Sequence, residues 1–132
     1  MKKPKITMDI IKEDVGYSAV TTVLDKFIGT EGEDFEELKA NILEAVNLGF
    51  EEAGFKYTID EIILRPDLPS FFAFYKVINA KVLGRRIGMS QSLLAQYING
   101  IKKPSAKQTQ RILDGVQQVG RELVAIQFLS FK

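Results

Sequence analysis

Apolar and polar residues alternate at the start of the chain and recur at helical spacing further on. Positions 6, 8 and 10 are apolar and predict a strand with one buried face. Threonines and β-branched residues predict a second strand over about 17–24, followed by a short extended segment at 27–28. Apolar residues between 35 and 50 follow the period of a helix, and residues 58–64 predict a last strand. The first half therefore predicts the order ββ(β)αβ.

Local signals mark the ends of these elements. Asp34 with Glu37 three residues later fits an N-cap with a capping box, and Gly54 fits a C-terminal stop. Two prolines in RPDLP, residues 65–69, then disfavour both helix and central strand. We therefore expect two domains, residues 1–65 and 66–132.

The second half has the pattern of several short helices. We expect helices at about 70–78, 80–87, 91–98 and 106–121, the last three with N-caps at Asn79, Ser90 and Ser105. The apolar residues expected to pack them together are Leu83, Ile87, Leu94, Ile98, Ile101 and Ile112. Gly84 permits close helix approach, and Gly88 suits a turn that needs positive φ. The stretch 83–105 predicts a helix-turn-helix in an all-α domain, and the whole chain is expected to be α+β.

Charge divides the chain at the same place. Residues 1–64 hold seven lysines and 14 acidic residues, a net charge of −7, whereas residues 65–132 hold 11 basic and three acidic residues, a net charge of +8. No Asp or Glu occurs between Asp67 and Asp114. This asymmetry indicates a nucleic-acid-binding half and an acidic half with another partner.

The chain has no cysteine and no histidine, which narrows the chemistry. Thiol chemistry, Ser-His triads and the commonest zinc ligand sets are excluded. The basic N-terminus precedes no long apolar run, so we expect a cytoplasmic protein with no signal peptide or membrane span.

Polar residues on the predicted 91–98 helix are candidates for reading DNA. Polar side chains near the start of such a helix can reach base edges in the major groove, while basic side chains nearby contact phosphates. The candidate base contacts are Gln91, Ser92 and Gln96, and the candidate phosphate contacts are Ser90, Arg85, Arg86, Lys102 and Lys103. An all-helical protein-interaction module, with these side chains merely solvated, is the alternative.

Two clusters have competing interpretations. The carboxylates Asp9, Glu13, Asp14, Glu31, Glu33 and Asp34 could form a two-metal nuclease site, but they also suit turns and a helix start. The aromatic residues Phe71, Phe72, Phe74 and Tyr75 could stack on single strands or belong to the core. We favour the local and core interpretations.

Two segments carry a family resemblance. Residues 16–54, GYSAVTTVLDKFIGTEGEDFEELKANILEAVNLGFEEAG, resemble the N-terminal domain of HicB antitoxins, and residues 83–105, LGRRIGMSQSLLAQYINGIKKPS, resemble the phage-repressor (XRE) type of helix-turn-helix. The resemblance implies an antitoxin whose partial RNase H-like domain blocks a HicA-like basic ribonuclease toxin. It further implies that the C-terminal domain binds double-stranded operator DNA and represses the operon. Asn99 matches a usual phosphate contact in the exit loop.

The resemblance also has departures and consequences. Repressors often carry a supporting Gln where this chain has Ala80, and no set of metal-binding carboxylates is recognisable, so we expect no enzymatic activity, metal or cofactor. We expect a homodimer, with the apolar tail 123–131 as a contact, and toxin binding through Glu13, Asp14, Glu36 and Glu37. The alternative is a one-component repressor whose N-terminal domain senses a small ligand.

Overall fold

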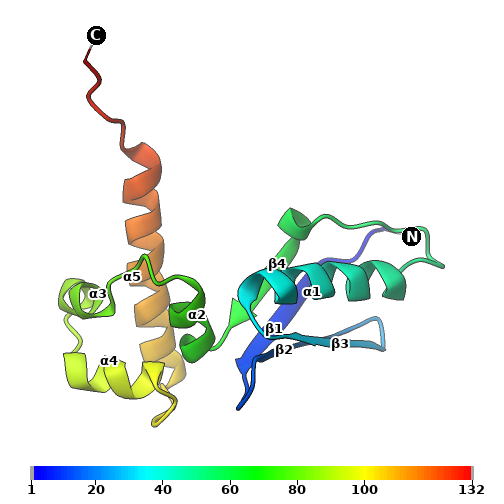
Figure 1. Cartoon of the computed structure of the whole chain (residues 1–132), viewed down its shortest axis with the longest axis horizontal. Coiled ribbons are helices and arrows are strands. Elements are labelled where there is room, and N and C mark those ends of the chain that lie inside the picture. Colours follow the sequence, from blue (N-terminus) through cyan, green and yellow to red (C-terminus); the bar gives the residue numbers. More distant parts are fainter. Residues whose placement is uncertain (1, 132) are drawn as a thin grey trace. The chain divides into compact units, whose positions relative to one another are not determined.

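The computed structural model describes residues 2–131 and forms two compact units that divide between Tyr75 and Lys76 (Figure 1). The N-terminal unit is a mixed sheet with two helices, and the C-terminal unit has three helices. The α+β prediction is therefore confirmed. Within residues 2–131, no helix is both long and apolar enough to cross a bilayer.

Four strands in the order β3-β2-β1-β4 build the N-terminal sheet. Neighbours among the first three strands are antiparallel, whereas the last strand is parallel to the first. The strands are β1 Ile6–Lys12, β2 Tyr17–Val23, β3 Lys26–Gly32 and β4 Ile62–Pro66. Helix α1, Phe35–Gly49, covers one face of this sheet (Figure 1).

The core of this unit lies between α1 and the covered sheet face. The residues of β1 predicted to point inward, Ile6, Met8 and Ile10, are at most 1 % exposed. They pack with Leu38, Ile42 and Val46, which recur every four residues on α1. The alternation in the first strand and the period of the helix are thus both confirmed.

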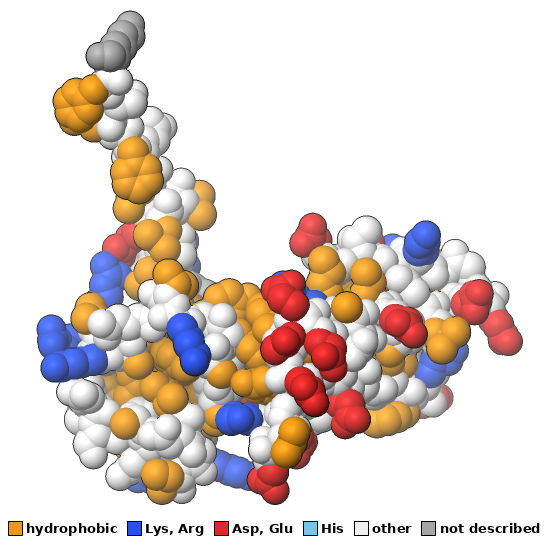
Figure 2. Space-filling model, in the orientation of Figure 1, with side chains coloured by type: hydrophobic (Ala, Val, Ile, Leu, Met, Phe, Trp, Pro, Cys, Tyr) orange, Lys and Arg blue, Asp and Glu red, His pale blue; other side chains and the backbone are white. Residues whose placement is uncertain are grey.

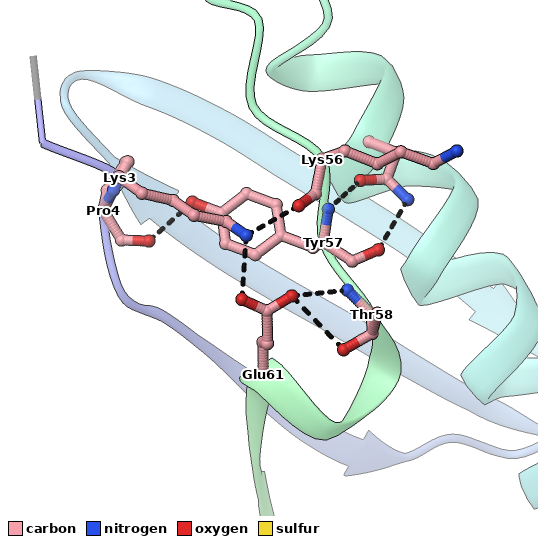
Figure 3. Close-up of polar contacts among 7 residues, drawn as sticks. Lys3, Pro4, Lys56, Tyr57, Thr58 and Glu61 are labelled. Carbon is pink, nitrogen blue, oxygen red and sulfur yellow. Dashed lines mark hydrogen bonds and ion pairs between the residues drawn. The ribbon is translucent and has the colours of Figure 1, made fainter.

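Tyr57 fastens the chain segment after α1 to the N-terminus (Figure 3). Its hydroxyl donates to the Pro4 carbonyl at 2.5 Å, and Asn47 of α1 bonds both its backbone N–H and its carbonyl. The Lys3 ammonium donates to the Lys56 carbonyl at 2.6 Å and to the Glu61 carboxylate at 2.8 Å. Burial raises the pKa of Tyr57, whereas hydrogen bonds from Lys3 and then Thr58 lower that of Glu61.

Two strand boundaries differ from the sequence prediction. β3 is a full strand, because a two-residue turn with positive φ at Leu24 and Asp25 connects it directly to β2. The last strand begins at Ile62 rather than at 58, since residues 59–61 form a 3₁₀ turn (Ile59–Glu61). Short-range turn chemistry decided both boundaries.

The domain boundary predicted at 65/66 was wrong by ten residues. Helix α2, Leu68–Phe74, belongs to the N-terminal unit because its N-cap Asp67 is bonded to β1. The Asp67 N–H donates to the Ile10 carbonyl at 2.9 Å, and the Lys12 N–H donates to the Asp67 carboxylate at 3.0 Å. The two prolines end β4 and begin α2 without separating the domains.

The aromatic run 71–75 contributes to packing, as the core interpretation predicted. Phe72 is buried, and Phe74 stacks on Phe35 of α1 with ring centroids 4.2 Å apart. Tyr75 and the same Phe35 ring form a T-shaped pair with ring centroids 5.6 Å apart.

The C-terminal unit contains α3, Ala80–Ile87, α4, Gln91–Ile98, and α5, Ala106–Ala125. The predicted N-caps Asn79, Ser90 and Ser105 each accept a backbone N–H three residues on. The buried apolar residues of this unit are Leu83, Met89, Leu94, Tyr97 and Ile112. Ile101, predicted as a packing residue, is 76 % exposed because it follows the end of α4 in a turn, and the buried Tyr97 was missed.

Candidate nucleic-acid interface

A tight turn joins α3 to α4. Gly88 has φ +69°, and the Met89 N–H donates to the Gly84 carbonyl at 2.9 Å. A Cβ on Gly84 would lie 3.2 Å from the Met89 carbonyl oxygen, so a larger residue would crowd the turn. The positive φ predicted at Gly88 is confirmed, whereas the close neighbour of Gly84 is a backbone carbonyl of the turn rather than the neighbouring helix.

Arg111 of α5 holds this turn from the other side. Its guanidinium donates to the Ile87 carbonyl at 3.1 and 2.7 Å and to the Gly88 carbonyl at 2.7 Å. These carbonyls lie at the end of α3, where no helical N–H remains to bond them. Sequence reasoning missed Arg111, because nothing in the local pattern links it to carbonyls 23 and 24 residues earlier.

Helix α4 buries one face and exposes two of the three side chains predicted to contact bases. Leu94 and Tyr97 are 1 % and 5 % exposed and hold the helix in the unit. Gln91 and Ser92, at its N-terminal end, are exposed, whereas Gln96 is half-buried. The N-cap Ser90 is exposed as well, and its hydroxyl accepts the Leu93 N–H at 3.2 Å. Ala80 lies at the first position of α3, as the sequence indicated.

The exit from α4 presents two lysines. Asn99 is the exposed C-cap, and Gly100 follows with φ +72°. The N–H groups of Ile101 and Lys102 both donate to the Gln96 carbonyl, at 2.9 and 3.3 Å. Lys102 and Lys103 are exposed on the resulting turn, and neither forms an ion pair within the described part of the chain.

The two arginines of α3 differ in their surroundings. Arg85 is exposed and forms no ion pair among residues 2–131. Arg86 is held by Glu122 of α5, with two nitrogen–oxygen distances of 2.6 and 3.0 Å. This pairing raises the pKa of Arg86 and lowers that of Glu122. Arg86 therefore braces α3 against α5, which differs from the free phosphate contact that was predicted.

The acidic residues predicted to bind a toxin lie in two segments of the N-terminal unit. Glu13 and Asp14 are in the turn after β1, and Glu36 and Glu37 begin α1. The pairings Lys12 with Tyr17 and Tyr17 with Gly32 bring the end of β3 to the same end of the sheet as that turn. All four carboxylates are exposed, and Figure 2 shows acidic side chains crowded on this unit.

Several of these carboxylates have local partners. Glu13 accepts the Ser18 hydroxyl at 2.8 Å, and Glu36 pairs with Lys39 at 2.9 Å. Asp34 caps α1 by accepting the Glu37 N–H, as predicted. Within residues 2–131, no group of three or more carboxylates is arranged to hold a metal ion, so the two-metal interpretation gains no support.

Comparisons with protein-family models, curated proteins and solved structures give no match to this chain.

Proposed function

We propose that this chain is a HicB-like antitoxin that represses its own operon. One observation carries the DNA-binding part: a glycine turn held by Arg111 leads into α4, whose first residues Gln91 and Ser92 are exposed. The same unit exposes three cations that form no ion pair among residues 2–131: Arg85, Lys102 and Lys103. This arrangement fits a helix-turn-helix, with α4 as the recognition helix. The C-terminal unit, residues 76–131, has nine basic and two acidic residues, a charge that suits a phosphate backbone.

In this proposal, α4 enters the major groove by its N-terminal end. The Gln91 amide can donate one hydrogen bond to an adenine and accept another from it. The Ser92 hydroxyl can make a single hydrogen bond to a base edge, as donor or acceptor. Lys102, Lys103 and Arg85 contact phosphates, which set affinity but carry no sequence information. Asn99 and Ser90 lie at the two ends of α4, where the helix approaches the sugar-phosphate backbone.

The N-terminal unit supplies the toxin-binding part of the proposal. Its order ββ(β)αβ is compatible with a partial RNase H-like domain, and its net charge opposes that of a ribonuclease that grips RNA. Glu13, Asp14, Glu36 and Glu37 provide an acidic surface for the encounter with a HicA-like toxin.

DNA binding is tested on a fragment from upstream of the chain's own gene. We expect Gln91→Ala to weaken specific binding by roughly 1 to 3 kcal/mol and to leave binding to random DNA unchanged. Gln110→Ala, an exposed glutamine on α5, is the matched control and should change neither. Equal losses on both DNAs would contradict base reading by Gln91.

Toxin binding is tested with the product of the adjacent gene. Reversing Glu36 and Glu37 to Lys should slow association about tenfold or more at low salt, because the steering field is weakened. Reversing Glu51 and Glu52, which follow α1 at its other end, changes the net charge equally and serves as the control. If the wild-type chain does not bind that product, and a metabolite alters its DNA binding, a ligand-sensing repressor replaces the antitoxin.

A further inference from the structure

The two edge strands of the N-terminal sheet differ in how they are protected. β4 is five residues long and ends at Pro66, whereas β3, at the opposite edge, has seven residues and no proline (Figure 1). Short length and proline are common features that stop an edge strand from pairing with another chain. β3 has neither of them.

The register of the hairpin β2–β3 fixes which backbone groups of β3 point away from the sheet. The residues on either side of its two-residue turn form the first hydrogen-bonded pair, and bonded and non-bonded pairs alternate from there. The N–H and C=O groups of Phe27, Gly29 and Glu31 therefore point outward. The Glu31 carbonyl agrees with this direction, because it accepts a hydrogen bond from Nδ2 of Asn41 on α1 at 2.8 Å.

The middle of this edge is open. Among residues 2–131, no hydrogen bond reaches the N–H or C=O groups of Phe27 and Gly29. The Phe27 side chain is 68 % exposed, and Gly29 has no side chain that could cover the backbone. Lys26, the one basic residue of β3, does not cover it either, because its ammonium donates to the Gly49 carbonyl of α1. Four backbone groups are thus free to pair with another strand.

Acidic residues lie at one end of the open edge. Glu31 ends the exposed part of β3 and Glu33 follows it, while Glu13 and Asp14 lie at the same end of the sheet in the turn after β1. Residues 2–75 hold eight basic and 15 acidic residues, a net charge of −7. This charge repels a second copy of the unit and attracts a basic segment of another protein.

We propose that an extended basic segment of the toxin adds to β3 as a fifth strand of the sheet. The identity of this partner rests on the proposed function. The free groups of Phe27 and Gly29 form backbone hydrogen bonds with the added strand, which give affinity without depending on its sequence. Phe27 and Glu31 lie on one face of β3, so they select an apolar and a basic side chain four positions apart on the added strand.

The test is amide hydrogen exchange of the full-length chain, free and bound to the product of the adjacent gene. We expect the N–H groups of Phe27 and Gly29 to exchange rapidly in the free chain and about 100-fold or more slowly in the complex. Lys56, exposed in the loop after α1, supplies the control amide, because its N–H forms no hydrogen bond within the described residues. Its exchange should be the same in both states.

Two variants separate the backbone contact from the side-chain contact. Phe27→Ala removes the ring but keeps the N–H, whereas Phe27→Pro removes both. We expect the dissociation constant of the complex to be about tenfold or more higher for Phe27→Pro than for Phe27→Ala. Both variants should keep the circular dichroism of the wild type, because the N–H at position 27 is not bonded to β2.

The remaining outcomes separate this inference from the proposed function. Equal affinity of the two variants, or rapid exchange of Phe27 and Gly29 in a complex that does form, overturns the strand addition and leaves the antitoxin proposal standing. A wild-type chain that does not bind the adjacent gene product overturns both. If Phe27→Pro loses the circular dichroism of the sheet, the amide exchange of the wild type alone decides.

Discussion

The N-terminal and C-terminal units differ in what stabilises each of them internally. The N-terminal unit buries twelve apolar residues, most of them between the sheet and α1, whereas the C-terminal unit buries five. Two arginines add long-range contacts to this smaller core. Arg86 pairs with Glu122, and Arg111 donates hydrogen bonds to backbone carbonyls at the end of α3. This unit also leaves apolar side chains exposed on α5 and the tail: Leu113, Leu123, Val124, Ile126, Phe128, Leu129 and Phe131. A three-helix unit of this size buries only a small apolar core, so these polar contacts add to its stability.

Their charges differ as clearly as their cores. Residues 2–75 hold eight basic and 15 acidic side chains, and residues 76–131 hold nine and two. Under the proposed function, the acidic unit meets the toxin and the basic unit meets DNA. The difference between the two cores predicts that equivalent core substitutions destabilise the two units to different extents.

The largest effect is expected from truncating one central residue in each core. Ile112→Ala and Ile42→Ala each remove a side chain that is at most 1 % exposed, at a cost of about 2 to 5 kcal/mol. Because the C-terminal core is smaller, Ile112→Ala should abolish hydrogen-exchange protection throughout α3–α5, whereas Ile42→Ala should only reduce protection in the N-terminal unit. Comparable residual protection in both variants would refute the contrast.

A smaller effect is expected from removing the arginine brace. Arg111→Met retains the aliphatic part of the side chain but leaves the Ile87 and Gly88 carbonyls without their donor, which should destabilise the C-terminal unit by about 1 to 3 kcal/mol. Denaturant unfolding followed by amide signals of α3 measures this change. Arg121→Met is the control, because within residues 2–131 Arg121 donates only to Gln118. Equal stability of the two variants would mean that the brace is dispensable.

The smallest effect is expected from acid, and it should appear in both units. Glu61 and Glu122 have pKa values lowered from 4.5 by hydrogen bonds from Lys3 and Arg86. Since a lowered folded-state pKa stabilises the fold above the unfolded value, this contribution is present above about pH 4.5 and is lost as the pH falls through the folded pKa. Glu61→Gln should flatten the acid limb of the stability curve of the N-terminal unit, and Glu122→Gln that of the C-terminal unit. An unchanged acid limb in either variant would show that the ion pair is too solvated to matter.

Local signals in the sequence account for the elements that were predicted well. Alternation in β1, the helical period of α1 and the side-chain caps Asp34, Asn79, Ser90 and Ser105 involve residues at most a few positions apart. Capping and periodicity act over a single turn or strand, so they are readable without the fold. The exposed positions of Gln91 and Ser92 followed from the same periodicity.

By itself, the sequence determined the α+β class, the order of the elements and the division of charge. Only the tertiary structure decided that α2 belongs to the N-terminal unit, that Tyr57 fastens residues 53 positions apart, and that Arg86 is bound to Glu122. It also brought α5 so close to α3 that a Cβ on Gly115 would overlap the Ile87 side chain. The physical reason is that these features depend on distances between segments far apart in the chain, which local propensity and periodicity do not specify.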